Sequence, residues 1–241
     1  MKSVDLTAHF VVHSKSPPVA PTKSLALAHA ERAAAIDRRH AEQTLDTVAS
    51  LRDKYANPVF GRVRVWSLVE MLSQCIDPTD QRLYAASQQM HVLQILEAME
   101  SENAATDELV LAALVHDLGK VLLLTDEAPE NVVCMNTPIG SPAPGSGFAN
   151  CVFQWNHDEF AWSRLKDYLP EGIAWLVRYH SVLPAQCAHL MDARDRDFAE
   201  RYLQPFARYD HGTKSPFFLP KKRIEHYRSV IEKWLPATIV W

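Results

Sequence analysis

The chain has 241 residues, 47% of them apolar and 22% charged, and its formal net charge is −4 with histidine taken as neutral. This composition is typical of a globular protein and excludes a disordered chain, a fibre or a small disulfide-stapled domain. The slight acidic excess gives no support to nucleic acid as a partner. The sequence has no glycine-rich phosphate loop, so we expect no NAD or flavin cofactor.

The first segment of the chain predicts no regular structure. Residues 1–23 contain Pro17, Pro18 and Pro21 among scattered polar groups, and we interpret them as an irregular N-terminal arm. They lack the apolar run of a signal peptide, and no stretch of the chain is apolar for long enough to span a membrane. The four cysteines form no CxxC pair, so we expect reduced, mostly buried thiols. These features predict a cytoplasmic protein without a membrane partner.

From Ser24 onward the sequence predicts helices. An Ala-, Leu-, Glu- and Arg-rich stretch predicts one helix with Ser24 as its N-cap and Tyr55 near its end. Pro205 is expected to kink or interrupt a later helix, and residues 136–150 are predicted to form a loop. No segment shows the alternation of a strand. We therefore predict an all-α fold in which residues 24–241 form a single domain. The further helices are expected over residues 66–75, 87–99, 107–124, 157–168, 171–180, 195–208 and 221–234.

The most apolar of these segments carries a charged pair. Residues 107–124 are apolar on all sides except at His116, Asp117 and Lys120, which predicts a buried central helix. A buried charge is costly unless it is paired or bound to a metal ion. For His116 and Asp117 alone, a core histidine bonded to a main-chain carbonyl is the simpler interpretation. The rest of the sequence favours a metal site instead.

Four histidines and two aspartates occur in the order His91, His116, Asp117, His157, His180 and Asp210, each in or beside a predicted helix. This ordered set is the ligand pattern of the HD-domain superfamily, which the chain resembles. Imidazole and carboxylate ligands suit first-row metals such as iron and manganese. One carboxylate can bridge two such ions, and Asp117 is the natural bridge. The negative charge of these ligands is smaller than the positive charge of a mixed-valent iron pair. Positive charge is therefore left over, and we expect an alcohol to bind as its negatively charged alkoxide.

Sequence motifs around these ligands narrow the resemblance. The chain resembles the myo-inositol oxygenase family over about residues 40–241. The motifs that carry this resemblance are HDLGKVL, WNHDEF, RYHS, YDHGTKS, Trp241, and the segments 42–46 and 77–80.

The resemblance implies an HD-type helical bundle with two iron ions in the mixed-valent Fe(II)/Fe(III) state. It implies that O2 is used to oxidise and cleave a C–C bond of a cyclitol or related alcohol, without NAD or flavin. One iron would be held by His91, His116, Asp117 and Asp210. The other would be held by Asp117, His157 and His180.

Five further residues match substrate-binding positions of that family. Lys120 is expected to face the metals, bind substrate and act as the catalytic cation; a lysine that extends to solvent is the alternative. Ser181 and Lys214 are expected to bind hydroxyl groups of the substrate. The alternatives are a helix-end serine without a functional role for Ser181 and a solvated loop lysine for Lys214. Asp77 and Thr79 match weaker contacts, and a turn-forming role is equally compatible with them.

The chain also departs from the family pattern. A Gly-Asp pair, whose aspartate binds substrate hydroxyls, is replaced here by Cys134 and Met135, and no arginine in residues 1–40 corresponds to the family's N-terminal arginine. A less polar pocket favours a less hydroxylated alcohol or diol, with inositol still possible. Asp158 and Glu159 could orient ligand imidazoles, but we interpret them as ordinary first-turn helix acids.

Other functions remain open at the level of sequence. A metal-dependent HD phosphohydrolase would use the same ligands, with Lys120 and Lys214 facing a phosphate. A non-catalytic metal-binding scaffold is a third possibility. The expected partners are a small polyol or alcohol and O2. The sequence leaves the oligomeric state open, and a monomer is compatible with it.

Overall fold

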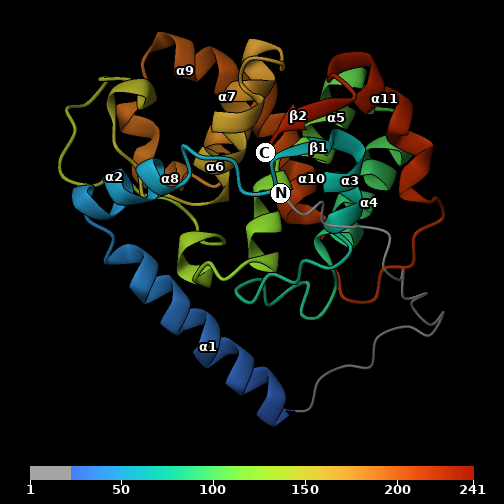
Figure 1. The fold of residues 1–241 in the computed structure, drawn as a ribbon, viewed down its shortest axis with the longest axis horizontal. Helices are drawn as coiled ribbons and strands as arrows, with labels where there is room; N and C mark the ends of the chain where they lie inside the picture. The colour runs from blue at the N-terminus through green and yellow to red at the C-terminus, as the bar shows by residue number, and fades with distance from the viewer. Residues whose placement is uncertain (1–22) are drawn as a thin grey trace.

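The computed structural model describes residues 23–241, and within them the chain folds mainly into helices with one two-stranded sheet (Figure 1). The all-α prediction is confirmed. The predicted arm, residues 1–23, lies outside the described residues apart from its last residue. The α-helices are α1 (Lys23–Ala41), α2 (Leu45–Lys54), α3 (Val65–Met71), α4 (Gln88–Ser101), α5 (Asp107–Val115), α6 (His157–Leu165), α7 (Glu171–Tyr179), α8 (Pro184–Cys187), α9 (Ala193–Phe198), α10 (Gln204–Gly212) and α11 (Arg228–Trp234).

Tighter or wider helical turns connect these helices. The 3₁₀ turns are η1 (Leu118–Leu124), η2 (Pro129–Asn131), η3 (Phe148–Asn150), η4 (Ala188–Leu190) and η6 (Ile224–Tyr227), and η5 (Ala199–Leu203) is a π-helical turn.

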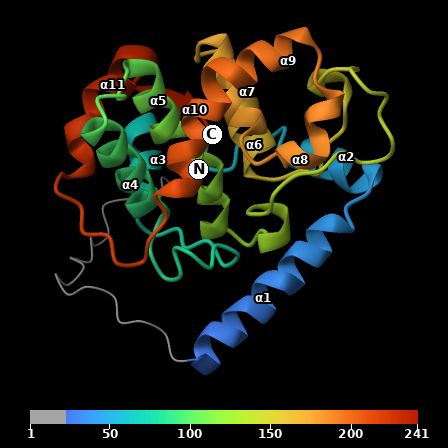
Figure 2. The same cartoon turned by 180° about the vertical axis from the view of Figure 1, so that it is seen from behind.

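The single helix predicted from Ser24 to Tyr55 is two helices. The first ends at Ala41, and Thr44 caps the start of the second: its hydroxyl accepts from the Thr47 N–H at 3.2 Å while its own N–H donates to the Thr47 hydroxyl at 3.3 Å. The helix α1 begins at Lys23, so Ser24 lies inside it and is not its N-cap. In both ribbon views α1 projects from the body as an arm (Figures 1 and 2).

The helix predicted over residues 107–124 is also divided. The helix α5 ends at Val115, and η1 begins at Leu118, so His116 and Asp117 occupy the junction. Most of the segment is buried, as its composition predicts. The prediction missed the break because both halves are equally apolar, and no Gly or Pro lies at the junction itself to mark it.

The helix predicted over residues 195–208 is divided into α9, η5 and α10. Pro205 is the second residue of α10, where its missing N–H costs nothing in hydrogen bonding. The interruption therefore lies just before the proline, and α10 is free to present Asp210 to the interior.

A small sheet was not predicted. Strand β1 (Arg62–Arg64) pairs antiparallel with β2 (Thr238–Val240), with Val63 opposite Ile239. Three-residue strands are too short to show an alternating pattern. The main-chain oxygen of Trp241 accepts from Val59 and Phe60 at 2.8 and 2.9 Å, which fastens this end of the chain to the start of the sheet.

The apolar side chains form two clusters. The larger one is built from the helices α1 to α7, α10 and α11, with Trp155, Phe206 and Trp241 among its fully or almost fully buried members. A smaller one lies beneath the 136–150 loop and contains Phe148, Trp175 and Leu190. All four cysteines are buried and free, as expected.

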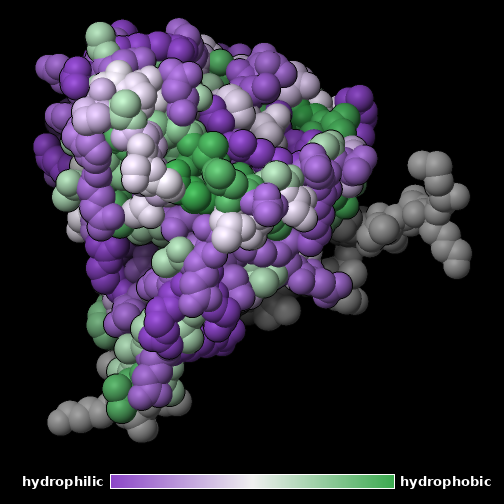
Figure 3. Space-filling view, turned by 90° about the vertical axis from the view of Figure 1, so that its left-hand side faces the viewer, coloured by the Kyte–Doolittle hydropathy of each residue, from purple (hydrophilic) through white to green (hydrophobic). Residues whose placement is uncertain are grey.

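Seen from the side of α1 and α2, the surface is largely hydrophilic, interrupted by an apolar patch on the body of the molecule (Figure 3). No helix among residues 23–241 has the length and apolar character needed to pass through a bilayer.

Candidate metal centre

The six predicted ligands converge in the interior, where each is at most 5% exposed. They come from elements far apart in the sequence. His91 lies on α4, Asp210 on α10, and His116 and Asp117 lie at the junction between α5 and η1. The first residue of α6 is His157, and His180 directly follows α7.

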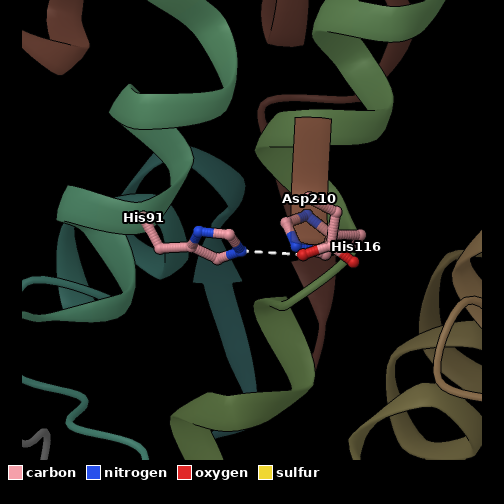
Figure 4. Close-up of side chains that lie close together, drawn as sticks. All are labelled: His91, His116 and Asp210. Atoms are coloured by element: carbon pink, nitrogen blue, oxygen red, sulfur yellow. Dashed lines mark hydrogen bonds and ion pairs between the residues drawn. The ribbon is translucent and has the colours of Figure 1, made fainter. Parts of the chain in front are cut away.

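His91 and Asp210 face each other across the gap between α4 and α10. The Nε2 atom of His91 lies 2.9 Å from Oδ1 of Asp210, and His116 lies beside the pair (Figure 4). Each of the three residues offers a ligand atom within 4.8 Å of the others, which is close enough for one metal ion. The sequence interval between His91 and Asp210 is 119 residues.

Asp117 lies between this group and the remaining histidines. Its Oδ2 is 3.2 Å from Nε2 of His116. Its Oδ1 is 3.1 Å from Nε2 of His157 and 3.6 Å from Nε2 of His180. The two oxygens of one carboxylate therefore face two different sets of imidazoles, which is the arrangement that a bridging ligand requires.

Main-chain carbonyls orient three of the four imidazoles. The Nδ1 atoms of His116, His157 and His180 lie 3.0, 2.5 and 3.1 Å from carbonyl oxygens. A carbonyl only accepts, so each of these Nδ1 atoms carries a proton and each Nε2 faces the centre. Among residues 23–241, the buried Nε2 of His116 has no hydrogen-bond partner. This donor set fits a first-row metal ion, because an imidazole ligand commonly donates its other N–H to an acceptor.

The electrostatics of the centre favour ionised carboxylates. Burial alone would raise the pKa of Asp117, but His116 and Lys120 outweigh it and hold this pKa well below its usual range. Burial alone would also raise the pKa of Asp210, but His91 and Lys214 outweigh burial and hold this pKa well below its usual range. Two ionised acids are therefore ready to bind a cation.

The imidazoles differ from one another. Burial lowers the pKa of His91 to about 4. Burial also lowers the pKa of His180, but Asp158 and Asp117 overcome this effect and raise it to about 9. Metal binding at His180 would therefore displace a proton.

Lys120 is buried among acceptors. Its Nζ lies 3.1 Å from each of Asp117 Oδ2, Asp77 Oδ2 and the Gln88 side-chain oxygen. The alternative of a lysine that extends to solvent is excluded, since the residue is 5% exposed. Gln88 was not predicted, although it precedes His91 by three residues and therefore shares its helix face.

Lys214 forms a second bridge of this kind. Its Nζ lies 2.7 Å from Asp80 Oδ2 and 3.8 Å from Asp210 Oδ1. Each lysine thus joins an inner carboxylate to an acid of the 77–80 turn. Within that turn Asp77 accepts from the N–H and hydroxyl of Thr79 at 2.8 and 2.7 Å, so both residues do shape the turn.

Asp158 is in the first turn of α6, as predicted, but it is fully buried and belongs to the centre. Its carboxylate accepts from the main-chain N–H and the hydroxyl of Ser181 at 3.1 and 3.0 Å, and lies 3.0 Å from Nε2 of His157. Glu159 points elsewhere and pairs with Arg178 at 2.8 Å. The sequence feature that could have indicated the burial of Asp158 beside the centre is its position directly after His157.

A cavity of about 400 Å³ opens onto the centre. All five predicted substrate-contact residues line it, together with four of the six predicted ligands; His91 and His116 do not line it and are fully buried. Cys134 and Met135 line it too. Residues that sequence reasoning missed are Asp37, Asp80, Arg82 and His211.

Comparison with known proteins gives a consistent result. The sequence model of the family described as "Myo-inositol oxygenase" matches residues 31–141 and 125–241. Inositol oxygenase 2 of Arabidopsis thaliana is 30% identical over 243 residues, covering 84% of this chain and 76% of that protein. A probable inositol oxygenase of Oryza sativa is 29% identical, covering 84% and 78%. The inositol oxygenase of Mus musculus is 25% identical, with 84% of each chain covered.

Proposed function

Since this chain belongs to the myo-inositol oxygenase family, we propose that it holds two iron ions and uses O2 to cleave a C–C bond of a cyclitol. The observation that carries the proposal is the position of Asp117, whose two oxygens face His116 on one side and His157 and His180 on the other. An oxygenase of the inositol type is the activity that family membership supports.

The contacts support the two ligand sets that the family resemblance implies. His91, His116, Asp117 and Asp210 would hold one iron, and Asp117, His157 and His180 the other. When bound, a mixed-valent iron pair supplies O2 activation and lowers the pKa of a coordinated alcohol. Three of the four ligand imidazoles are already turned for this role, because main-chain carbonyls accept from the Nδ1 atoms of His116, His157 and His180.

Lys120 would bind the reacting end of the substrate. Its ammonium already lies 3.1 Å from Asp117, so a hydroxyl beside the centre would come within its reach. Burial would lower the pKa of this lysine, but Asp117 and Asp77 outweigh burial and raise it, which keeps the side chain charged. A fixed cation at this place stabilises negative charge on a substrate oxygen.

Ser181 and Lys214 would bind further hydroxyl groups. Asp158 accepts the hydroxyl proton of Ser181 at 3.0 Å, so the lone pairs of the serine oxygen are left for a substrate O–H donor. Lys214 pairs with Asp80, and this pairing holds its ammonium beside the second inner carboxylate, that of Asp210. The two lysines, each fixed by an acid of the 77–80 turn, would position a polyol without moving themselves.

The substrate is the part of this proposal that depends on Met135. Cys134 and Met135 line the cavity, and Met135 is 38% exposed, so one side of the pocket carries sulfur atoms and methyl groups. A cyclitol fits the polar side, and a less hydroxylated alcohol or diol would fit the apolar side better.

A phosphohydrolase would use the same metal ligands but needs cations free to face a phosphate. Lys120 is shared by Asp117 and Asp77, and Lys214 pairs with Asp80. These pairings supply negative charge where a phosphate would lie, and they favour the oxygenase.

Oxygen uptake tests the proposal. The iron-loaded chain is expected to consume one O2 per molecule of myo-inositol converted to glucuronate, with no added reductant, since the substrate supplies all four electrons. A magnesium-dependent release of phosphate from phosphate esters, with no uptake of O2 in the presence of any polyol, would overturn it.

A further inference from the structure

The arm α1 is fastened to the body at its C-terminal end. Ala33, Ile36 and His40 share one face of the helix and are all buried. His40 makes the specific contacts: its Nδ1 lies 2.7 Å from the main-chain oxygen of Glu130, and its Nε2 lies 3.1 Å from the side-chain oxygen of Asn136. Arg39 adds an ion pair with the Glu130 carboxylate at 2.6 Å.

The two anchoring partners flank the apolar wall of the cavity. Glu130 precedes and Asn136 follows the segment Val133–Cys134–Met135, and all three residues of that segment line the cavity. The end of α1 is therefore held across this wall. These contacts fix how the last turns of α1 are rotated about the helix axis and where they lie along it.

This anchoring places Asp37 at the cavity. Asp37 is one of its lining residues, and it lies on the turn between Ile36 and His40. Burial raises the pKa of the Cys134 thiol, and the charge of Asp37 and its hydrogen bond with that thiol raise it further, which locates the carboxylate beside the wall. Within residues 23–241, Asp37 makes no ion pair, and the single proton of the Cys134 thiol can engage only one of its two oxygens, so the other oxygen remains available to a ligand.

We propose that Asp37 is a specificity-determining residue that accepts a hydrogen bond from a substrate hydroxyl facing the Val133–Cys134–Met135 wall. The proposal rests on the proposed function and names what that side of the pocket recognises. An isopropyl group, a thiol and a thioether offer a hydroxyl only weak partners, whereas an ionised carboxylate accepts strongly. This side of the cavity thus combines an apolar wall with the carboxylate of Asp37, and a polyol can be held there.

Binding of myo-inositol to the anaerobic, iron-loaded full chain tests this role by calorimetry. Asp37→Ala is expected to weaken binding about ten-fold, the effect of losing one charge-assisted hydrogen bond. Asp37→Asn keeps an acceptor oxygen without the charge and should lie between the two. Glu31→Ala is the matched control, because Glu31 is an exposed acid on the same helix that does not line the cavity.

A series of monodeoxyinositols gives a readout that a merely structural role would not move. One deoxy analogue should bind the native chain about ten-fold more weakly than myo-inositol does, and Asp37→Ala should bind this analogue and myo-inositol equally well. Turnover should change mainly in KM, with a smaller change in kcat.

The possible results separate the two proposals. Two results would overturn the role of Asp37 alone. One is equal affinity of the native chain and Asp37→Ala for myo-inositol. The other is that every deoxy analogue loses the same affinity, relative to myo-inositol, in both proteins. Binding of myo-inositol without any uptake of O2 would overturn the proposed function alone. No binding of myo-inositol by the native chain would count against both.

Discussion

Gly119 packs against the main chain of His157 so closely that a Cβ atom at position 119 would lie 2.1 Å from the His157 carbonyl oxygen. Gly119 lies on η1, two residues after Asp117, and His157 begins α6. The absence of a side chain at this one position lets the two elements approach. Their approach brings the Nε2 of His157 to 3.1 Å from Asp117.

Gly119→Ala should therefore separate η1 from α6. The obstacle is main chain and cannot rotate away, so we expect a loss of about 1–3 kcal/mol in unfolding free energy, as for other overpacked sites. Weaker iron binding should accompany it, because Asp117 and His157 move apart. Thermal unfolding and iron content measure the two effects.

Gly212→Ala is the matched control, since a Cβ there meets nothing within 4 Å. It should be neutral or slightly stabilising. An Ala at position 119 that left both iron content and the melting temperature unchanged would mean that this close approach is not needed.

His116→Ala should abolish loading of the metal centre. His116 contributes a buried Nε2 that has no hydrogen-bond partner in the described part of the chain, and it lies beside both the His91–Asp210 pair and Asp117. Iron per chain, measured after anaerobic loading and desalting, should fall from about two to less than one. His226→Ala, at an exposed histidine outside the centre, should retain the native iron content.

Lys120→Met should cost both stability and turnover. Removing the ammonium leaves Asp77 and Asp117 buried without their cation, and breaking such a buried pair typically costs about 3–5 kcal/mol. Iron at Asp117 should recover part of this loss, so the metal-free variant should be affected more than the loaded one. Chemical denaturation of both forms checks the ordering.

The control for this variant is Lys221→Met, which removes an exposed lysine whose ammonium makes no ion pair among the described residues. Unchanged turnover in Lys120→Met would remove the lysine from the reaction, even if the protein were less stable.

Met135→Asp should shift the preference toward more hydroxylated substrates. A carboxylate would replace a thioether on the cavity wall, and one charge-assisted hydrogen bond changes affinity by about ten-fold or more. The ratio of kcat/KM for myo-inositol to that for a cyclohexanediol should rise by this factor. Leu219→Asp, at an exposed position that does not line the cavity, should leave the ratio unchanged.

The six candidate ligands stand out in the sequence because their order and chemistry are unusual: His116 and Asp117 interrupt an otherwise apolar segment, and a buried pair of this kind requires partners. The structure brings all six together. The burial of Asp158 beside the centre was harder to predict, because an acid in the first turn of a helix is common on protein surfaces. Only the tertiary position of Ser181 shows what this carboxylate contacts.

Other features left too little signal. Thr44 divides α1 from α2 through a Thr–Thr cap, where the usual capping partner is Glu or Gln. Strands β1 and β2 are too short to show a period. Asp37 lies on a helix whose exposed face is rich in charge, and only the anchoring of His40 reveals that it lines the cavity.

The central claim is that these side chains hold two redox-active iron ions. The most direct test is an electron paramagnetic resonance spectrum of the anaerobically loaded protein after oxidation by one electron per chain, together with its iron content. The account predicts about two iron ions per chain and the signal of a coupled Fe(II)/Fe(III) pair that changes when myo-inositol is added. One isolated iron per chain, or a colourless protein that binds only magnesium, would contradict it.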